Sequence, residues 1–309
     1  MFVAHASSRQ GGNGQPEHSK QVIRSTSTLV IVPTSVRSRS GEPIRNLGAN
    51  DFRLTDNEQE QKLYLERVED EPLALVVLMQ TGGAGSSELG NYGKLDSIVE
   101  SVLGKSPSKL ALVTFDSRVR QIWAFPPQVD GLDYGLTHQE AGDSGAAIRD
   151  AVRYAVSLLQ NQPVGFRRIV LLLSQGEDSS SESSSADVLR DVARSGATIY
   201  SLTFQVATTK TRDQKTNPPH RKFGERELAT IPNATPAELA AQSGGENLSF
   251  RDENDLKERM SALRDSIRSG YVLSFRPSSP TLGLHTIRVQ INPRRRRYKV
   301  MARNSYWLD

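Results

Sequence analysis

A continuous apolar run that ends at a glycine-rich turn is the feature that most constrains this chain. Residues 73–78 read LALVVL, and QTGGAG follows at 80–85. A strand that is apolar on both faces must be covered on both faces, as in a parallel sheet between layers of helices. Such sheets bind ligands beyond the carboxyl ends of their strands. The turn at 80–85 is therefore the first place to look for a functional site.

After this run, strand-like segments alternate with helical ones. Apolar strands and helices with one apolar face are predicted in turn at 95–103, 110–115, 148–159, 169–173 and 198–204. This alternation predicts an α/β fold, with a doubly wound, mainly parallel sheet at about 71–269. A serine run at 179–185 leads into one of the helices, and Ser185 is its predicted N-cap.

Both ends of the chain have the alternating pattern of antiparallel strands. Residues 26–70 contain short strand-like segments, and 270–309 return to strands after the last helix. The C-terminal strands have no later α/β unit to join, so we expect them to pair with the N-terminal ones. This predicts a second, smaller antiparallel β-sandwich-like domain built from both chain termini. Residues 1–25 are polar and aperiodic, which predicts a disordered tail, and 207–235 form a structureless insert.

Composition excludes several kinds of site. The 309 residues include no cysteine, which excludes disulfides, thiol nucleophiles and Cys-ligated zinc. The net charge of +4 is mild, so a polyanion would need basic residues gathered in one place. One such patch exists at a predicted hairpin tip: Arg294, Arg295, Arg296, Arg297 and Lys299. No apolar run reaches the roughly 18 residues of a membrane span, and the first residues lack the apolar core of a signal peptide.

The glycine-rich turn does not match a phosphate-binding loop. Gly83 and Gly85 supply G-x-G, but Glu88 stands where the third glycine is needed. A Walker motif fails too, because Asn91 follows Gly90 where a lysine is required. Nothing in the chain assembles a nucleophile, a base and oxyanion donors, so we predict a non-enzymatic protein without a cofactor.

Several stretches occur in an order that resembles a known family. They are GEPIRNLGANDF at 41–52, IVLLLSQGED at 169–178, AAQSGG at 240–245, YVLSFRP at 271–277 and ARNSYW at 302–307. Together they resemble the von Willebrand factor type A (VWA) family, and more narrowly the VWFA-related proteins of acidobacteria. The resemblance covers about 26–309. It implies a Rossmann-like VWA fold, a role in adhesion or protein binding, and an extracytoplasmic or secreted location.

The resemblance also says where a metal would be held. Type A domains commonly carry a metal-ion-dependent adhesion site, with D-x-S-x-S after the first strand, a Thr on a second loop and an Asp on a third. These positions fall on Gln80, Gly82, Ala84, Ala146 and Gln175 of this chain. A hard divalent cation needs convergent oxygens, including negative ones. The resemblance therefore implies a degenerate adhesion site without its metal.

Three hypotheses for function follow. In the leading one, a protein partner of unknown identity contacts three top loops, 80–87, 143–146 and 175–185, through Gln80, Thr81, Gly82, Ala84, Ser144, Ala146, Gln175, Glu177 and Asp178. The alternative is binding of nucleic acid, another polyanion or an acidic partner by the arginine-rich hairpin at 294–299, since guanidinium groups bind phosphate and carboxylate well. A third is a divalent cation displaced toward Asp178.

Overall fold

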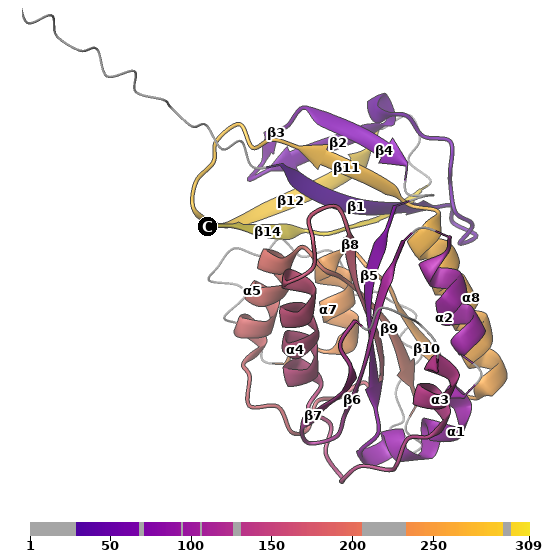
Figure 1. Cartoon of the computed structure of the whole chain (residues 1–309). Coiled ribbons are helices and arrows are strands. Elements are labelled where there is room, and N and C mark those ends of the chain that lie inside the picture. The colour runs from indigo at the N-terminus through magenta and orange to yellow at the C-terminus, as the bar shows by residue number, and fades with distance from the viewer. Residues whose placement is uncertain are drawn as a thin grey trace, which may run out of the picture.

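A computed structural model describes residues 29–67, 71–93, 95–105, 107–125, 131–205, 233–292 and 298–309. The predicted tail at 1–25, the four arginines at 294–297 and most of the insert at 207–235 lie outside these residues. The described chain forms a mixed α/β body around a mainly parallel six-stranded sheet, with two four-stranded antiparallel sheets beside it (Figure 1).

The apolar run forms a central strand of the six-stranded sheet. β5 (Leu73–Gln80) pairs in parallel with β6 (Lys109–Phe115) and with β8 (Arg167–Ser174), and every residue of β5 is buried. The strand order is β10-β9-β8-β5-β6-β7. The outer strands are β7 (Val119–Trp123), which is antiparallel, β9 (Thr198–Phe204) and β10 (Asn247–Phe250). The predicted strand with two covered faces is confirmed.

Helices cover both faces of this sheet (Figure 1). One layer consists of α4 (Ile148–Gln160), α5 (Ser185–Ser195) and α7 (Pro236–Ser243). The other consists of α1 (Leu89–Tyr92), α2 (Asp96–Leu103), α3 (Leu132–Thr137) and α8 (Glu253–Arg268). Alternate side chains of β5 enter two separate apolar cores, one under each layer. This is the reason that the strand tolerates no polar residue before its last position.

The N-cap of α5 differs from the prediction. Ser184, not Ser185, is the cap, and its hydroxyl accepts a hydrogen bond from Asp187 N at 3.1 Å. Ser185 is the first residue of the helix, and its buried hydroxyl accepts from Ala234 N at 2.8 Å. A contact with a distant segment therefore decides which serine of the run caps the helix.

Strands from both ends of the chain build the two antiparallel sheets. β1 (Val30–Arg37) lies between β11 (Tyr271–Phe275) and β13 (Lys299–Ala302), with β4 (Leu63–Arg67) at the edge. In the second sheet, β12 (Gly283–Ile291) lies between the N-terminal and C-terminal strands β2 (Phe52–Asp56) and β14 (Ser305–Leu308), and β3 (Gln59–Glu60) is the other edge. The apolar faces of the two sheets share one core. The predicted pairing of C-terminal with N-terminal strands is confirmed.

These sheets, here called the sandwich, cover one end of the α/β body. α1 follows the glycine-rich turn after β5, and it lies at the end of the body farthest from the sandwich (Figure 1). The top loops are therefore presented away from the sandwich. In the part of the chain that the structure describes, no helix is long and apolar enough to cross a membrane.

Candidate functional site

The three top loops meet at the carboxyl ends of the parallel strands. The amide of Gly83 donates to the carbonyl of Asp143 at 2.7 Å, which joins the first loop to the second. The amide of Ser179 donates to the carbonyl of Ala146 at 3.0 Å, which joins the third loop to the second. Segments about a hundred residues apart in the chain therefore form one continuous surface.

Gln80 and Gln175, two of the residues that the resemblance places at metal positions, contact each other. Gln80, fully buried at the end of β5, donates from Nε2 to Gln175 Oε1 at 3.0 Å and to Gly82 O at 2.9 Å. Its Oε1 accepts from the backbone amide of Gln175 at 2.9 Å. Gln175 in turn donates from Nε2 to Glu177 O at 2.7 Å. This amide pair joins the ends of β5 and β8 with neutral hydrogen bonds alone.

The glycines of the first loop are needed for close packing. A Cβ on Gly82 would lie 2.6 Å from the Cβ of Asp116 and 2.6 Å from the carbonyl oxygen of Gly145. A Cβ on Gly85 would lie 2.6 Å from the carbonyl oxygen of Gln80. All three distances are far inside van der Waals contact, so neither position has room for a side chain. Close packing therefore explains the glycine-rich turn, against neighbouring loops at Gly82 and against Gln80 of the same turn at Gly85.

Placing a serine at position 82, where the VWA resemblance implies one, is expected to damage the fold. We expect Gly82→Ser to lower the free energy of unfolding by roughly 1–3 kcal/mol, because the loops must separate to admit the side chain. Urea unfolding in the absence of magnesium and in about 5 mM magnesium measures this loss. Ala84→Ser, at the next position of the motif but only partly buried, is the control, with an expected loss below about 1 kcal/mol. Stabilisation of Gly82→Ser by magnesium would contradict the prediction.

Two carboxylates, buried Asp116 and exposed Asp143, accept hydrogen bonds at the top loops. Asp116 directly follows β6, is fully buried, and accepts from Arg120 Nε at 3.0 Å. Asp143 is exposed; it accepts from the Ser117 hydroxyl and from the amides of Ser117 and Gly145, at 2.9 and 2.8 Å. The Ser117 hydroxyl, followed by these amides, lowers the pKa of Asp143 below its ordinary value. Sequence reasoning missed the role of Asp116, although its place directly after an apolar strand is a signal that could have found it.

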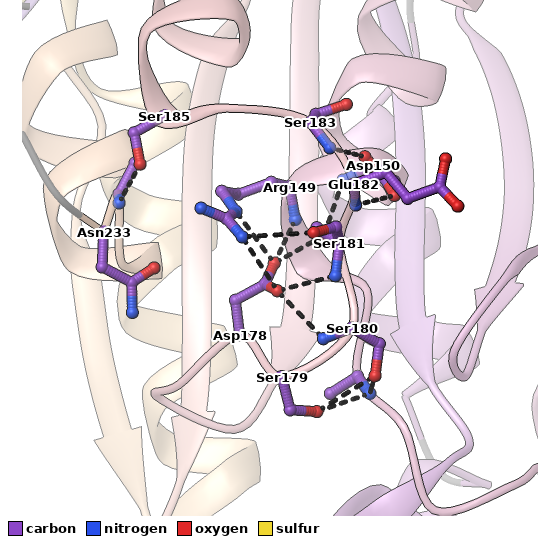
Figure 2. A network of polar contacts seen from close by, with 12 residues as sticks. Arg149, Asp150, Asp178, Ser179, Ser180, Ser181, Glu182, Ser183, Ser185 and Asn233 are labelled. Carbon is purple, nitrogen blue, oxygen red and sulfur yellow. Dashed lines mark hydrogen bonds and ion pairs between the residues drawn. The ribbon is translucent and has the colours of Figure 1, made fainter. Parts of the chain in front are cut away.

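Asp178 is enclosed by hydrogen-bond donors (Figure 2). Its Oδ2 accepts from Arg149 N at 2.8 Å and from the Ser181 hydroxyl at 2.6 Å, and its Oδ1 accepts from the amides of Ser180 and Ser181 at 3.2 and 3.0 Å. The Arg149 guanidinium lies 3.4 Å away. A carboxylate has about four lone-pair sites, and these contacts occupy them. The arrangement argues against a displaced cation at Asp178, and no cluster of three metal-ligating side chains occurs among the described residues.

The serine run belongs to the same network (Figure 2). Asp150, in the first turn of α4, accepts from the amides of Glu182 and Ser183 at 2.9 and 3.0 Å. Burial raises the pKa of Asp150, but hydrogen bonds from the Ser183 side chain and these amides together bring it below its ordinary value. α4 has no side-chain cap at its own N-cap residue. The loop and the helix therefore cap each other, which satisfies the free amides of the first turn.

Exposure separates the predicted binding residues into two groups. Ser144 and Glu177 are exposed, whereas Thr81 and Ala146 are buried and Ala84 is partly buried. The buried residues, with the amide pair, support the surface from beneath. Of the predicted polyanion residues, Lys299 is exposed at the start of β13, and the four arginines before it lie outside the described residues.

Comparison with known proteins adds only distant structural likenesses. No family model and no curated protein matches the sequence. An aerotolerance-related membrane protein from Bacteroides fragilis, with multiple mutations to serines, is 15% identical, with a TM-score of 0.44 over 63% of this chain and 98% of that chain. The conserved hypothetical protein BatB from Bacteroides thetaiotaomicron is 14% identical, with a TM-score of 0.41 over 63% and 98%. The pilus adhesin SpaC from Lactobacillus rhamnosus GG, in its open conformation, is 12% identical, with a TM-score of 0.44 over 76% and 35%.

Proposed function

We propose that this chain is a non-enzymatic, VWA-like binding module whose top loops contact a protein partner without a metal ion. The amide pair carries the proposal. Gln80 and Gln175 stand where the resemblance places metal-binding carboxylates, and they hold the ends of β5 and β8 together by hydrogen bonds. A surface that is ordered before binding loses less entropy when a partner docks. The resemblance supports an extracytoplasmic setting.

The contact surface includes exposed side chains from each of the three top loops: Ser86, Ser87, Asp143, Ser144 and Glu177. The hydroxyls of Ser86 and Ser87 donate within their own loop, each at 2.8 Å to a backbone carbonyl. Hydroxyl oxygens and ionised carboxylates therefore face solvent together. Such a surface offers mainly acceptors, and it suits a partner segment that presents amide or basic donors.

Affinity capture from the source cells tests the proposal. The wild-type chain is expected to retain a partner equally in magnesium and in EDTA, because the amide pair carries no cation. Ser144→Arg combined with Glu177→Arg places two bulky cations on exposed positions without touching the buried network, and we expect at least a tenfold loss, or about 1.4 kcal/mol.

A matched control adds an arginine away from the top loops. Ser157→Arg is exposed near the end of α4 that lies far from them, and it should retain the partner. Quantitative mass spectrometry of the captured proteins gives the ratio. Loss of the partner in EDTA would contradict metal-independent binding, and undiminished capture by the double variant would exclude the top loops as the contact surface.

A further inference from the structure

The strand β4 is an open edge of the sandwich, at the end of the molecule away from the top loops (Figure 1). Its sheet has the order β13-β1-β11-β4, and among the described residues β11 is the only strand that pairs with β4. Leu63 and Leu65 pack against the sandwich core but stay partly exposed. An edge strand of this kind presents unpaired backbone amides and carbonyls to which a further strand can bind.

The exposed face of this edge has a charge pattern that is complementary to itself. Lys62, Tyr64 and Glu66 alternate with the two leucines and are all exposed, Tyr64 by 46%. Lys62 Nζ lies over the Tyr64 ring, 5.9 Å from its centroid, so the two side chains share one face. Charges on an edge strand usually oppose pairing with another chain. Here the two charges have opposite signs and stand at equal distances in the sequence on either side of Tyr64.

We propose that β4 pairs with β4 of a second copy of this chain, antiparallel and about a two-fold axis at Tyr64. An axis normal to the sheet keeps every residue on its own face, so Lys62 of each copy stands opposite Glu66 of the other. The two Tyr64 rings meet as a cross-strand aromatic pair. The contact is isologous and joins two four-stranded sheets into one continuous sheet. It leaves the top loops of both copies free, because they lie at the other end of the molecule (Figure 1).

Charge selects this register over the two adjacent ones. An axis at Leu63 places Lys62 opposite Tyr64, and an axis at Leu65 places Glu66 opposite Tyr64. Neither of these registers forms an ion pair between opposite residues, whereas the axis at Tyr64 forms two. Because opposite charges on facing residues stabilise a strand pair and like charges destabilise it, the axis at Tyr64 is favoured. Five residues of β4 make a small interface, so we expect a weak dimer with a dissociation constant of about 10–100 µM.

Sedimentation equilibrium of the full chain at about 1–300 µM tests the pairing. The wild type is expected to change from monomer to dimer across this range. Lys62→Glu places glutamates opposite each other, and Glu66→Lys places lysines opposite each other. Each variant should therefore weaken association at least about tenfold. Both side chains are exposed, so we expect the two variants to keep the fold, which circular dichroism checks.

An equimolar mixture of the two variants tests the register. One chain then has glutamates at both positions and the other has lysines at both, so the mixture should associate as the wild type does, although neither variant does so alone. Glu258→Lys, exposed on α8, is the matched control and should leave association unchanged. A mixture that associates no better than its components would overturn the proposal. A wild type that stays monomeric to about 300 µM would also overturn it, in favour of a strand from another protein.

Discussion

Replacement of Asp178 by alanine is expected to lower the free energy of unfolding by about 3–5 kcal/mol, as for the loss of one partner of a buried ion pair. The Asp178 side chain is 1% exposed, and that of Arg149 is 17% exposed. Without the carboxylate, the guanidinium keeps its burial but loses its counter-ion. The amides of Arg149, Ser180 and Ser181 lose their acceptor in the same step.

Urea unfolding followed by circular dichroism measures this loss. Asp178→Asn keeps the shape and one acceptor, and we expect an intermediate loss of roughly 1–3 kcal/mol. Asp191→Ala removes a neighbouring but more exposed ion pair with Arg153, at 28% and 41% exposure, and should cost less than about 1 kcal/mol. If Asp178→Ala cost no more than Asp191→Ala, the carboxylate would be free enough to bind a cation, and the displaced-metal hypothesis would return.

Loss of the Arg303 side chain is the second large effect that we expect. This buried residue between β13 and β14 donates from NH2 to Ala193 O in the last turn of α5 at 3.1 Å, and from Nε to Ser305 O at 3.1 Å. A longer contact of 3.4 Å reaches Ile31 O on β1. Burial lowers the pKa of Arg303 to about 10, so the group is still charged at neutral pH. The negative end of the α5 dipole favours a cation at this position.

We expect Arg303→Met to lower the free energy of unfolding by about 2–4 kcal/mol, because methionine fills similar space but leaves the carbonyls without donors. Circular dichroism and Trp307 fluorescence, recorded on the same samples in a Trp123→Phe background, test this, since Trp307 of β14 stacks on Arg194 of α5. In the wild type the two signals should change together, since the guanidinium joins the sandwich to α5. In the variant we expect the fluorescence transition to come first. Arg259→Met, exposed on α8 and distant from Trp307 in the chain, is the control; an equal loss in both variants would contradict the assignment.

Arg303 is one of several arginines that meet helix ends beside the sandwich. Arg168 NH1 donates to Ser195 O of α5 at 2.7 Å, and Arg268 Nε donates to Val102 O of α2 at 2.7 Å. The C-terminal ends of α2, α5 and α8 lie on the side of the body that faces the sandwich (Figure 1). Guanidinium groups satisfy these carbonyls and offset the helix dipoles.

The division into a VWA-like domain at 71–269 and a separate β domain stays a prediction. The unfolding experiment with circular dichroism and Trp307 fluorescence also addresses it.

Residue pattern alone predicted the architecture around Leu73–Gln80. A run without a polar side chain is stable only between two covering layers, and amphipathic stripes after it supply those layers. The return to alternating strands at 270–309 predicted pairing across the chain, because strands without a partner leave their backbone groups unpaired. These inferences succeed because burial and periodicity are properties of a local segment.

Only the tertiary structure decided which packing and hydrogen-bond partners the residues of the top loops have. Gln80 and Gln175 are 95 positions apart, and only the adjacency of β5 and β8 brings their amides together. The lack of space at Gly82 likewise comes from neighbouring loops, and Asp178 combines donors of its own loop with the amide of Arg149 on α4. A residue type states which bonds a side chain can make, whereas the fold decides which partners are within reach. The loop QTGGAG is therefore packed and hydrogen-bonded because of residues that are distant from it in the sequence.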